Sequence, residues 1–173
     1  VDRAIALWTQ SAESGHAGAH HNLGNLLKTE RQDVDGAEKA YRAAIEADPG
    51  HAMAHNNLGI LLETERKDVD GAEKAYRAAT EADPRNANAY VNLGVLLQNE
   101  RKDVDGAVKA YRTAIKANPG YAKAHYNLGL LRVHAAIDIE EGGGDLRQAA
   151  AIWDIAVEHF KDAAARGIDD GSL

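Results

Sequence analysis

The sequence repeats itself every 35 residues. The tripeptide Asn-Leu-Gly begins at residues 22, 57, 92 and 127, and the segment Asp-Val-Asp-Gly-Ala begins at residues 33, 68 and 103. A proline follows at 49, 84 and 119 with the same spacing. A fixed period of this length is typical of a solenoid, because one repeat cannot bury its apolar face alone and must stack on its neighbours.

Each repeat contains two helical patterns. The first runs over residues 18–30, with apolar side chains at Ala19, Leu23, Leu26 and Leu27. The second begins near residue 35 and places apolar residues at 37, 40, 41, 44 and 45, which is the spacing of one helix face. The prolines cannot continue a helix and favour a turn between repeats. These patterns predict an all-α fold.

Local signals refine the helices. Asp35 and Glu38 have the spacing of a capping box, which Val108 interrupts in the third repeat. The glycines at 24, 59, 94 and 129 fall in the middle of helices, where each costs about 1 kcal/mol relative to alanine. Four such glycines in register predict a close approach by a neighbouring helix.

The period sets the boundaries of the repeats. Residues 1–16 form the second helix of a partial repeat, with Gly15 as its C-terminal cap. The full repeats are expected at 17–51, 52–86, 87–121 and 122–166, followed by a tail over 167–173. In the fourth repeat we expect a lengthened first helix, a turn at 140–144 and a long capping helix over 145–166. There Ala149 and Trp153 are expected to replace Ala107 and Tyr111.

Composition excludes several functional classes. The formal charge is −7, so the broad basic face that nucleic acids require is missing. Without cysteines there are no disulfides or thiolate metal sites, and no apolar run is long enough for a membrane span. Since the chain begins at Val1, we expect a piece of a longer protein. The sequence leaves the localisation unknown and favours the cytoplasm.

These residues resemble the tetratricopeptide repeat. Its pattern of Leu-Gly, then Ala-x3-aromatic, then Pro is met by Leu23-Gly24, Ala37-x3-Tyr41 and Pro49 and by their counterparts. The position of the family's tryptophan is instead occupied by His20, His55, Tyr90 and His125. The opening residues 12–24 look more like the related Sel1-like repeat. The resemblance implies a right-handed α-solenoid that binds proteins or peptides in a concave groove.

In the family, one face of the first helix of each repeat lines that groove. The face varies between repeats while the packing positions hardly change. It predicts the following peptide-binding residues: His21, Asn22, Asn25, Met53, Asn56, Asn57, Ile60, Asn88, Val91, Asn92, Val95, Lys123, Tyr126 and Asn127.

An asparagine recurs on this face at 22, 57, 92 and 127. A side-chain amide both donates and accepts hydrogen bonds, so a row of amides could hold the backbone of an extended peptide. Alternatively, each asparagine bonds a neighbouring helix, or simply survives from duplication. The sequence leaves these interpretations open.

Other sites are not expected. His16 and His20, like His51 and His55, have a metal-compatible spacing, but no third ligand is apparent. The segment 33–36 resembles part of a calcium loop but is better explained by helix capping. A carboxylate clamp of the family's kind lacks its cations. No nucleophile–base pair appears, so we expect no catalysis and no cofactor.

The sequence therefore predicts a scaffold that binds an extended peptide or a partner protein, with no nucleic acid and no membrane insertion. Two alternatives stay open. The chain could be a structural module that self-assembles through its terminal helices, or a targeting module of a larger enzyme.

Overall fold

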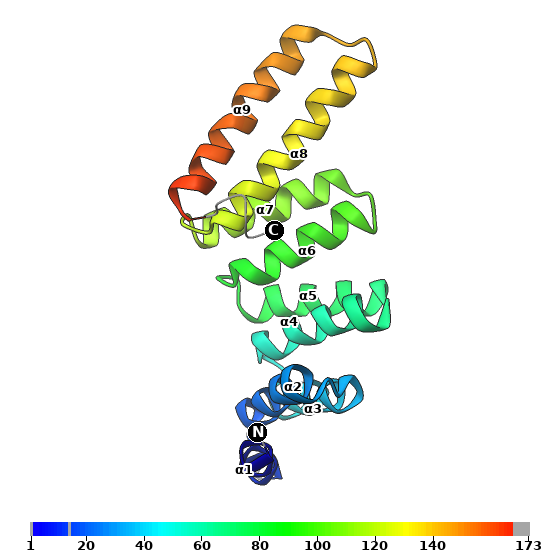
Figure 1. Cartoon of the computed structure of the whole chain (residues 1–173), viewed down its shortest axis with the longest axis vertical. Coiled ribbons are helices and arrows are strands. Elements are labelled where there is room, and N and C mark those ends of the chain that lie inside the picture. The colour runs from blue at the N-terminus through cyan, green and yellow to red at the C-terminus, as the bar shows by residue number, and fades with distance from the viewer. Residues whose placement is uncertain (1, 14, 168–173) are drawn as a thin grey trace. The chain divides into compact units, whose positions relative to one another are not determined.

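The computed structural model describes residues 2–13 and 15–167, and all regular structure in them is helical (Figure 1). The helices are α1 (Asp2–Glu13), α2 (Ala17–Arg31), α3 (Val34–Ala47), α4 (Ala52–Leu61), the π-helical turn η1 (Leu62–Arg66), α5 (Val69–Ala82), α6 (Ala87–Asn99), α7 (Val104–Ala117), α8 (Ala122–Glu141) and α9 (Leu146–Ala165). None of these helices combines the length and apolarity needed to cross a bilayer.

The chain forms two compact units, Val1–Ala89 and Tyr90–Leu173, which are described separately. In the first unit α2 pairs with α3 and α4 with α5, while α1 packs on α2 and α3 packs on α4. In the second unit α7 packs on α8, which pairs along its length with α9 (Figure 1). Consecutive helices of a repeat therefore form a hairpin.

An aromatic ring lies against a glycine inside each hairpin. A Cβ atom added to Gly59 would lie 2.6 Å from Cε1 of Tyr76, and the same clash would occur between Gly24 and Tyr41. A Cβ at Gly94 would lie 2.5 Å from Cε1 of Tyr111. The predicted close approach is confirmed, and the approaching group is the tyrosine of the second helix in the same repeat.

The fourth hairpin corrects one prediction. Gly129 lies against Phe160, whose Cε1 would be 2.9 Å from an added Cβ. Phe160, and not Trp153, therefore takes the place of the tyrosine, and Ala156 precedes it at the required spacing. Trp153 instead donates its Nε1–H to Glu140 Oε1 at 3.0 Å. Both helices are longer here, with 20 residues each, so the packing ring lies further along the chain than the predicted Trp153.

The helix caps correct a second prediction. Asp33, and not Asp35, caps α3, because its Oδ1 accepts the backbone N–H of Gly36 at 2.9 Å. Asp68 caps α5 in the same way, and Asp103 caps α7 despite Val108. Asp35 lies in the first turn and pairs with Arg66. The cap begins two residues earlier than the capping-box spacing suggested.

Two glycines end helices as predicted. Gly15 has φ +76° and donates its N–H to Ala12 O at 2.8 Å. Gly167, with φ +94°, donates to Ala164 O at 3.1 Å after α9. Both have the left-handed backbone that favours glycine. Of the tail predicted over 167–173, only Gly167 is among the described residues.

We expect Gly59→Ala to lower the free energy of unfolding by about 1–3 kcal/mol, because the added methyl overlaps the Tyr76 ring. Gly18→Ala in α2 is the matched control, since nothing lies within 4 Å of its added Cβ, and it should stabilise by up to about 1 kcal/mol. Urea unfolding of both variants measures this. Equal effects would show that the tyrosine contact is not tight.

Candidate functional site

The first helices of the four repeats are α2, α4, α6 and α8. We call the side of these helices that carries the recurring asparagines the asparagine face. Its predicted residues differ in exposure. Exposed side chains are Met53, Asn88 and Lys123; half-buried ones are Asn22, Asn25, Asn57, Ile60, Asn92, Val95, Tyr126 and Asn127; buried ones are His21, Asn56 and Val91. Met53 is the most notable, because 58% of a large apolar residue is exposed.

Hydrogen bonds join three of these side chains across two repeats. Asn57 on α4 donates from Nδ2 to Asn25 Oδ1 at 2.9 Å and to His21 Nε2 at 3.0 Å, both on α2. Tyr41 on α3 donates its hydroxyl to the same Asn25 oxygen at 2.8 Å. We call these four residues the α2–α4 polar cluster. It links α2, α3 and α4.

Tyr41 was not among the predicted site residues, although the sequence contains a signal for its role. A buried tyrosine hydroxyl needs an acceptor. In the next two repeats Tyr76 donates to Glu63 at 2.7 Å and Tyr111 donates to Gln98 at 3.0 Å. The equivalent position in the first repeat is Lys28, which cannot accept, so Tyr41 bonds Asn25 instead.

The contacts of His21 fix its protonation state. Its Nε2 faces the amide nitrogens of Asn57 at 3.0 Å and Asn25 at 3.4 Å. Because an amide nitrogen only donates, Nε2 must be the unprotonated acceptor and the ring is neutral. The His51 ring lies 5.1 Å away, and its Nδ1 caps α4 by accepting the Ala54 N–H at 3.1 Å. Burial, followed by the nearby His51, lowers the pKa of His21.

The described residues of the second unit, 90–167, do not form such a cluster. The counterparts of His21 and Asn25 in the third repeat are Val91 and Val95, which offer no side-chain acceptor. The Nδ2 atom of Asn127 is buried there without a hydrogen-bond partner. Its neighbour Tyr126 packs its ring 5.6 Å from that of Phe160 on α9.

The recurring asparagines therefore have different environments. Both amide hydrogens of Asn57 are used within the chain, which matches the interpretation that an asparagine bonds a neighbouring helix. Asn127 has no such bond from its amide nitrogen, and the polar contacts of Asn57 are not repeated there. The asparagines do not form one uniform row of free amides.

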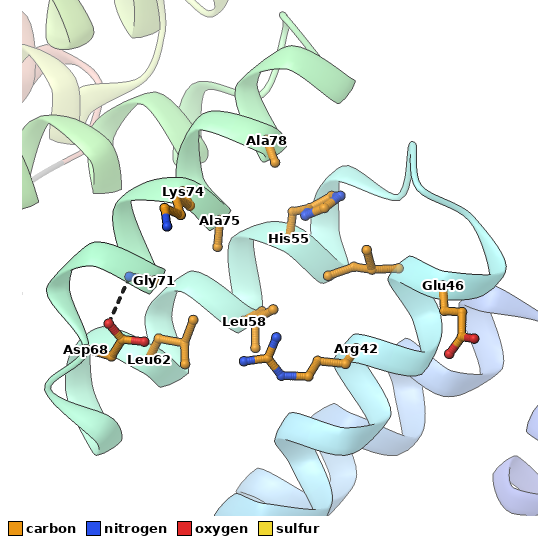
Figure 2. A pocket seen from close by; sticks show the side chains of 11 residues that line it. Arg42, Glu46, His55, Leu58, Leu62, Asp68, Gly71, Lys74, Ala75 and Ala78 are labelled. Carbon is orange, nitrogen blue, oxygen red and sulfur yellow. Dashed lines mark hydrogen bonds between the residues drawn. The ribbon is translucent and has the colours of Figure 1, made fainter.

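A groove lies on another side of the first unit, away from the predicted residues. Figure 2 shows its walls, with Arg42 and Glu46 on α3 and Lys74, Ala75 and Ala78 on α5. The floor includes His55 and Leu58 of α4 and Leu62 of η1. Its volume is about 490 Å³. We call it the α3–α5 groove. The small side chains of Ala75 and Ala78 on the α5 wall leave the groove open. The sequence shows these two alanines, but not that they line a groove.

Comparison with protein families identifies the repeats. Models described as tetratricopeptide repeat match residues 26–87 and 75–109, and one described as TPR repeat matches residues 98–133. The three ranges overlap and leave no gap between residues 26 and 133. The chain belongs to the tetratricopeptide-repeat family. The Sel1-like resemblance of residues 12–24 lies outside these ranges and stays a prediction.

Solved structures of tetratricopeptide-repeat proteins are similar to this one. MamA is 22% identical with a TM-score of 0.69, and the match covers 94% of this chain and 85% of MamA. YrrB, described as a TPR protein with an unusual peptide-binding site, is 19% identical with a TM-score of 0.67 over 92% and 81% of the two chains. The Arabidopsis OM64 TPR domain is 22% identical with a TM-score of 0.61, over 68% and 95%.

At this level of identity the similarity concerns the fold. The predicted all-α solenoid class of this tetratricopeptide-repeat protein is confirmed. No curated protein sequence matches the chain. The extent of one continuous solenoid over residues 1–173 stays a prediction.

We expect Asn57→Ala to lower the free energy of unfolding by about 1–2 kcal/mol, because it removes two hydrogen bonds between α2 and α4. Asn127→Ala is the matched variant in the second unit. It removes a buried amide nitrogen that has no partner, so stability should stay unchanged or rise. Chemical denaturation compares the two, and equal losses would contradict these roles.

Stability should fall as the pH falls below about 6.5. The folded-state pKa of His21 is lowered from its ordinary value of 6.5, so the unfolded chain takes up the proton first. A protonated Nε2 would also face two amide donors. Thermal melting at several pH values measures the loss, which His21→Gln should reduce because a glutamine oxygen accepts at any pH. An identical pH profile in that variant would exclude His21 as the source.

Proposed function

We propose that this tetratricopeptide-repeat protein is an interaction scaffold that binds an extended peptide or a partner protein along its asparagine face. The observation that carries the proposal is the exposed Met53 side chain beside the α2–α4 polar cluster. A large apolar side chain with 58% exposure on this face would gain about 1 kcal/mol or more from being covered by a ligand.

The variation between repeats supports this assignment. The packing glycines and tyrosines recur, whereas Met53 is replaced by Asn88 and Lys123 in the next two repeats. A face that changes while the packing stays constant is suited to ligand contact and not to a role in packing. The peptide-binding site that is ascribed to YrrB is consistent with such a role for the fold.

The residues divide into two roles. Met53, Asn88 and Lys123, which are exposed, contact the ligand directly. In the first unit His21 and Asn57 hold α2 and α4 together and keep Met53 on α4 in place. Ile60 and Val95, both half-buried, add apolar contacts in their respective units.

Selection of binders from a displayed library of random twelve-residue peptides tests the proposal. We expect the selected peptides to lose about tenfold or more in affinity for Met53→Lys, because a charge replaces an apolar contact. Val104→Lys is the control, since Val104 is 50% exposed but lies at the start of α7, off the asparagine face. Peptides that bind both variants and the parent equally would overturn the assignment.

Self-assembly is a second candidate, favoured by exposed apolar residues on the terminal helices. Leu7 is 58% exposed on α1, and Leu146 is 67% exposed on α9, which also exposes Ile155 and Val157. Sedimentation velocity over a wide range of concentrations tests it. A single monomeric species at every concentration would exclude assembly through these helices.

A further inference from the structure

The α3–α5 groove brings positive side chains from both walls together over an apolar floor. Arg42 on α3 and Lys74 on α5 line it, and Leu58 and Leu62 form part of its base (Figure 2). Arg42 uses Nε and Nη2 to contact Glu38 Oε1, at 3.0 and 2.9 Å, which leaves Nη1 for a ligand. His55 donates its Nε2–H to Pro49 O at 2.9 Å, so its Nδ1 carries no hydrogen while the ring is neutral.

The second unit contains the counterpart of this groove between α7 and α9, and there it is filled. The glycine–aromatic contacts align Tyr76 with Phe160, so Ala75 and Ala78 correspond to His159 and Asp162. The counterpart of His55 is His125, which donates its Nε2–H to Pro119 O at 3.0 Å in the same manner.

Two side chains of α9 cover His125. The ring of His159 lies 6.1 Å from its ring, and Asp162 Oδ2 lies 3.5 Å from its Nδ1. Only 7% of the His125 side chain remains exposed. In the first unit, alanines replace both covering residues, so the space that an imidazole and a carboxylate occupy in the second unit lies open beside His55.

We propose that the α3–α5 groove binds an acidic peptide segment of a partner protein, with a carboxylate beside His55 in the place that Asp162 takes beside His125. This site lies apart from the asparagine face and does not depend on the function proposed there. It also differs from the carboxylate clamp of the family, whose residues would lie on the first-helix face.

The chemistry of the groove specifies both parts of the ligand. The carboxylate accepts from Arg42 and Lys74, whose charge-assisted hydrogen bonds are stronger than neutral ones. A neighbouring aliphatic side chain covers Ile45, Leu58 and Leu62, which a simple anion could not do. Glu46 lies one turn beyond Arg42 on α3 and disfavours a second carboxylate at that end.

The test uses the tripeptide acetyl-Leu-Asp-Leu-amide, its Leu-Asn-Leu analogue and sodium acetate as probes, added to the full chain. Chemical shifts of the backbone amides report where each probe binds. We expect the aspartate peptide to shift Gly71 and the surrounding groove residues, with an affinity roughly tenfold above that of the asparagine peptide. Acetate should bind more weakly than the aspartate peptide.

Three variants sharpen the test. Ala75→His with Ala78→Asp copies the filled groove of the second unit and should abolish binding. Lys74→Glu, an exposed substitution that leaves the core untouched, should weaken binding roughly tenfold even if the double variant does not fold. Lys109→Glu, at the matching position of α7, is the control and should bind like the parent.

Several results would overturn the proposal. One is the absence of chemical-shift changes at up to about 10 mM peptide. Another is equal affinity for the aspartate and asparagine peptides. A third is that Lys74→Glu binds the aspartate peptide as tightly as the parent. Equal affinity for acetate would reject a peptide ligand. Shifts confined to the asparagine face would reject this groove while leaving the function proposed for that face intact.

Discussion

The packing of an aromatic ring on a glycine determines how each hairpin of this protein is built. A methyl group at Gly24, Gly59 or Gly94 would overlap the tyrosine of the following helix by more than its packing tolerates. The ring can lie this close to the backbone only because no Cβ is present. The fourth hairpin shows how strict this requirement is, since its longer helices still bring Phe160 onto Gly129.

Where the packing ring is a tyrosine, its hydroxyl needs an acceptor, and each of the three repeats supplies a different one. Glu63 and Gln98 serve the second and third tyrosines, whereas Lys28 forces Tyr41 to bond Asn25. That choice draws Asn57 and His21 into the same cluster and makes the contact between α2 and α4 polar. In the first repeat, the tyrosine is therefore bonded directly to a residue of the asparagine face.

The two units use one structural position in opposite ways. Where α9 places His159 and Asp162 against His125, α5 places two alanines and leaves a groove beside His55. The backbone contacts of the histidines are the same in both. A repeat fold can thus acquire a cavity by shortening two side chains, without disturbing the glycine–aromatic contact that holds the hairpin together.

The repeat, its helices and the glycine contacts could all be predicted from the sequence, because period, apolar spacing and chain-breaking residues are local properties that each repeat shows again. The asparagine face could be predicted in the same way. The partners of Asn57, the identity of Phe160 as the fourth packing ring and the cap at Asp33 emerged only when the chain was seen folded. Each depends on which groups come within about 3 Å of one another, a distance that residue spacing does not specify. The α3–α5 groove has the same origin, since its walls come from different repeats.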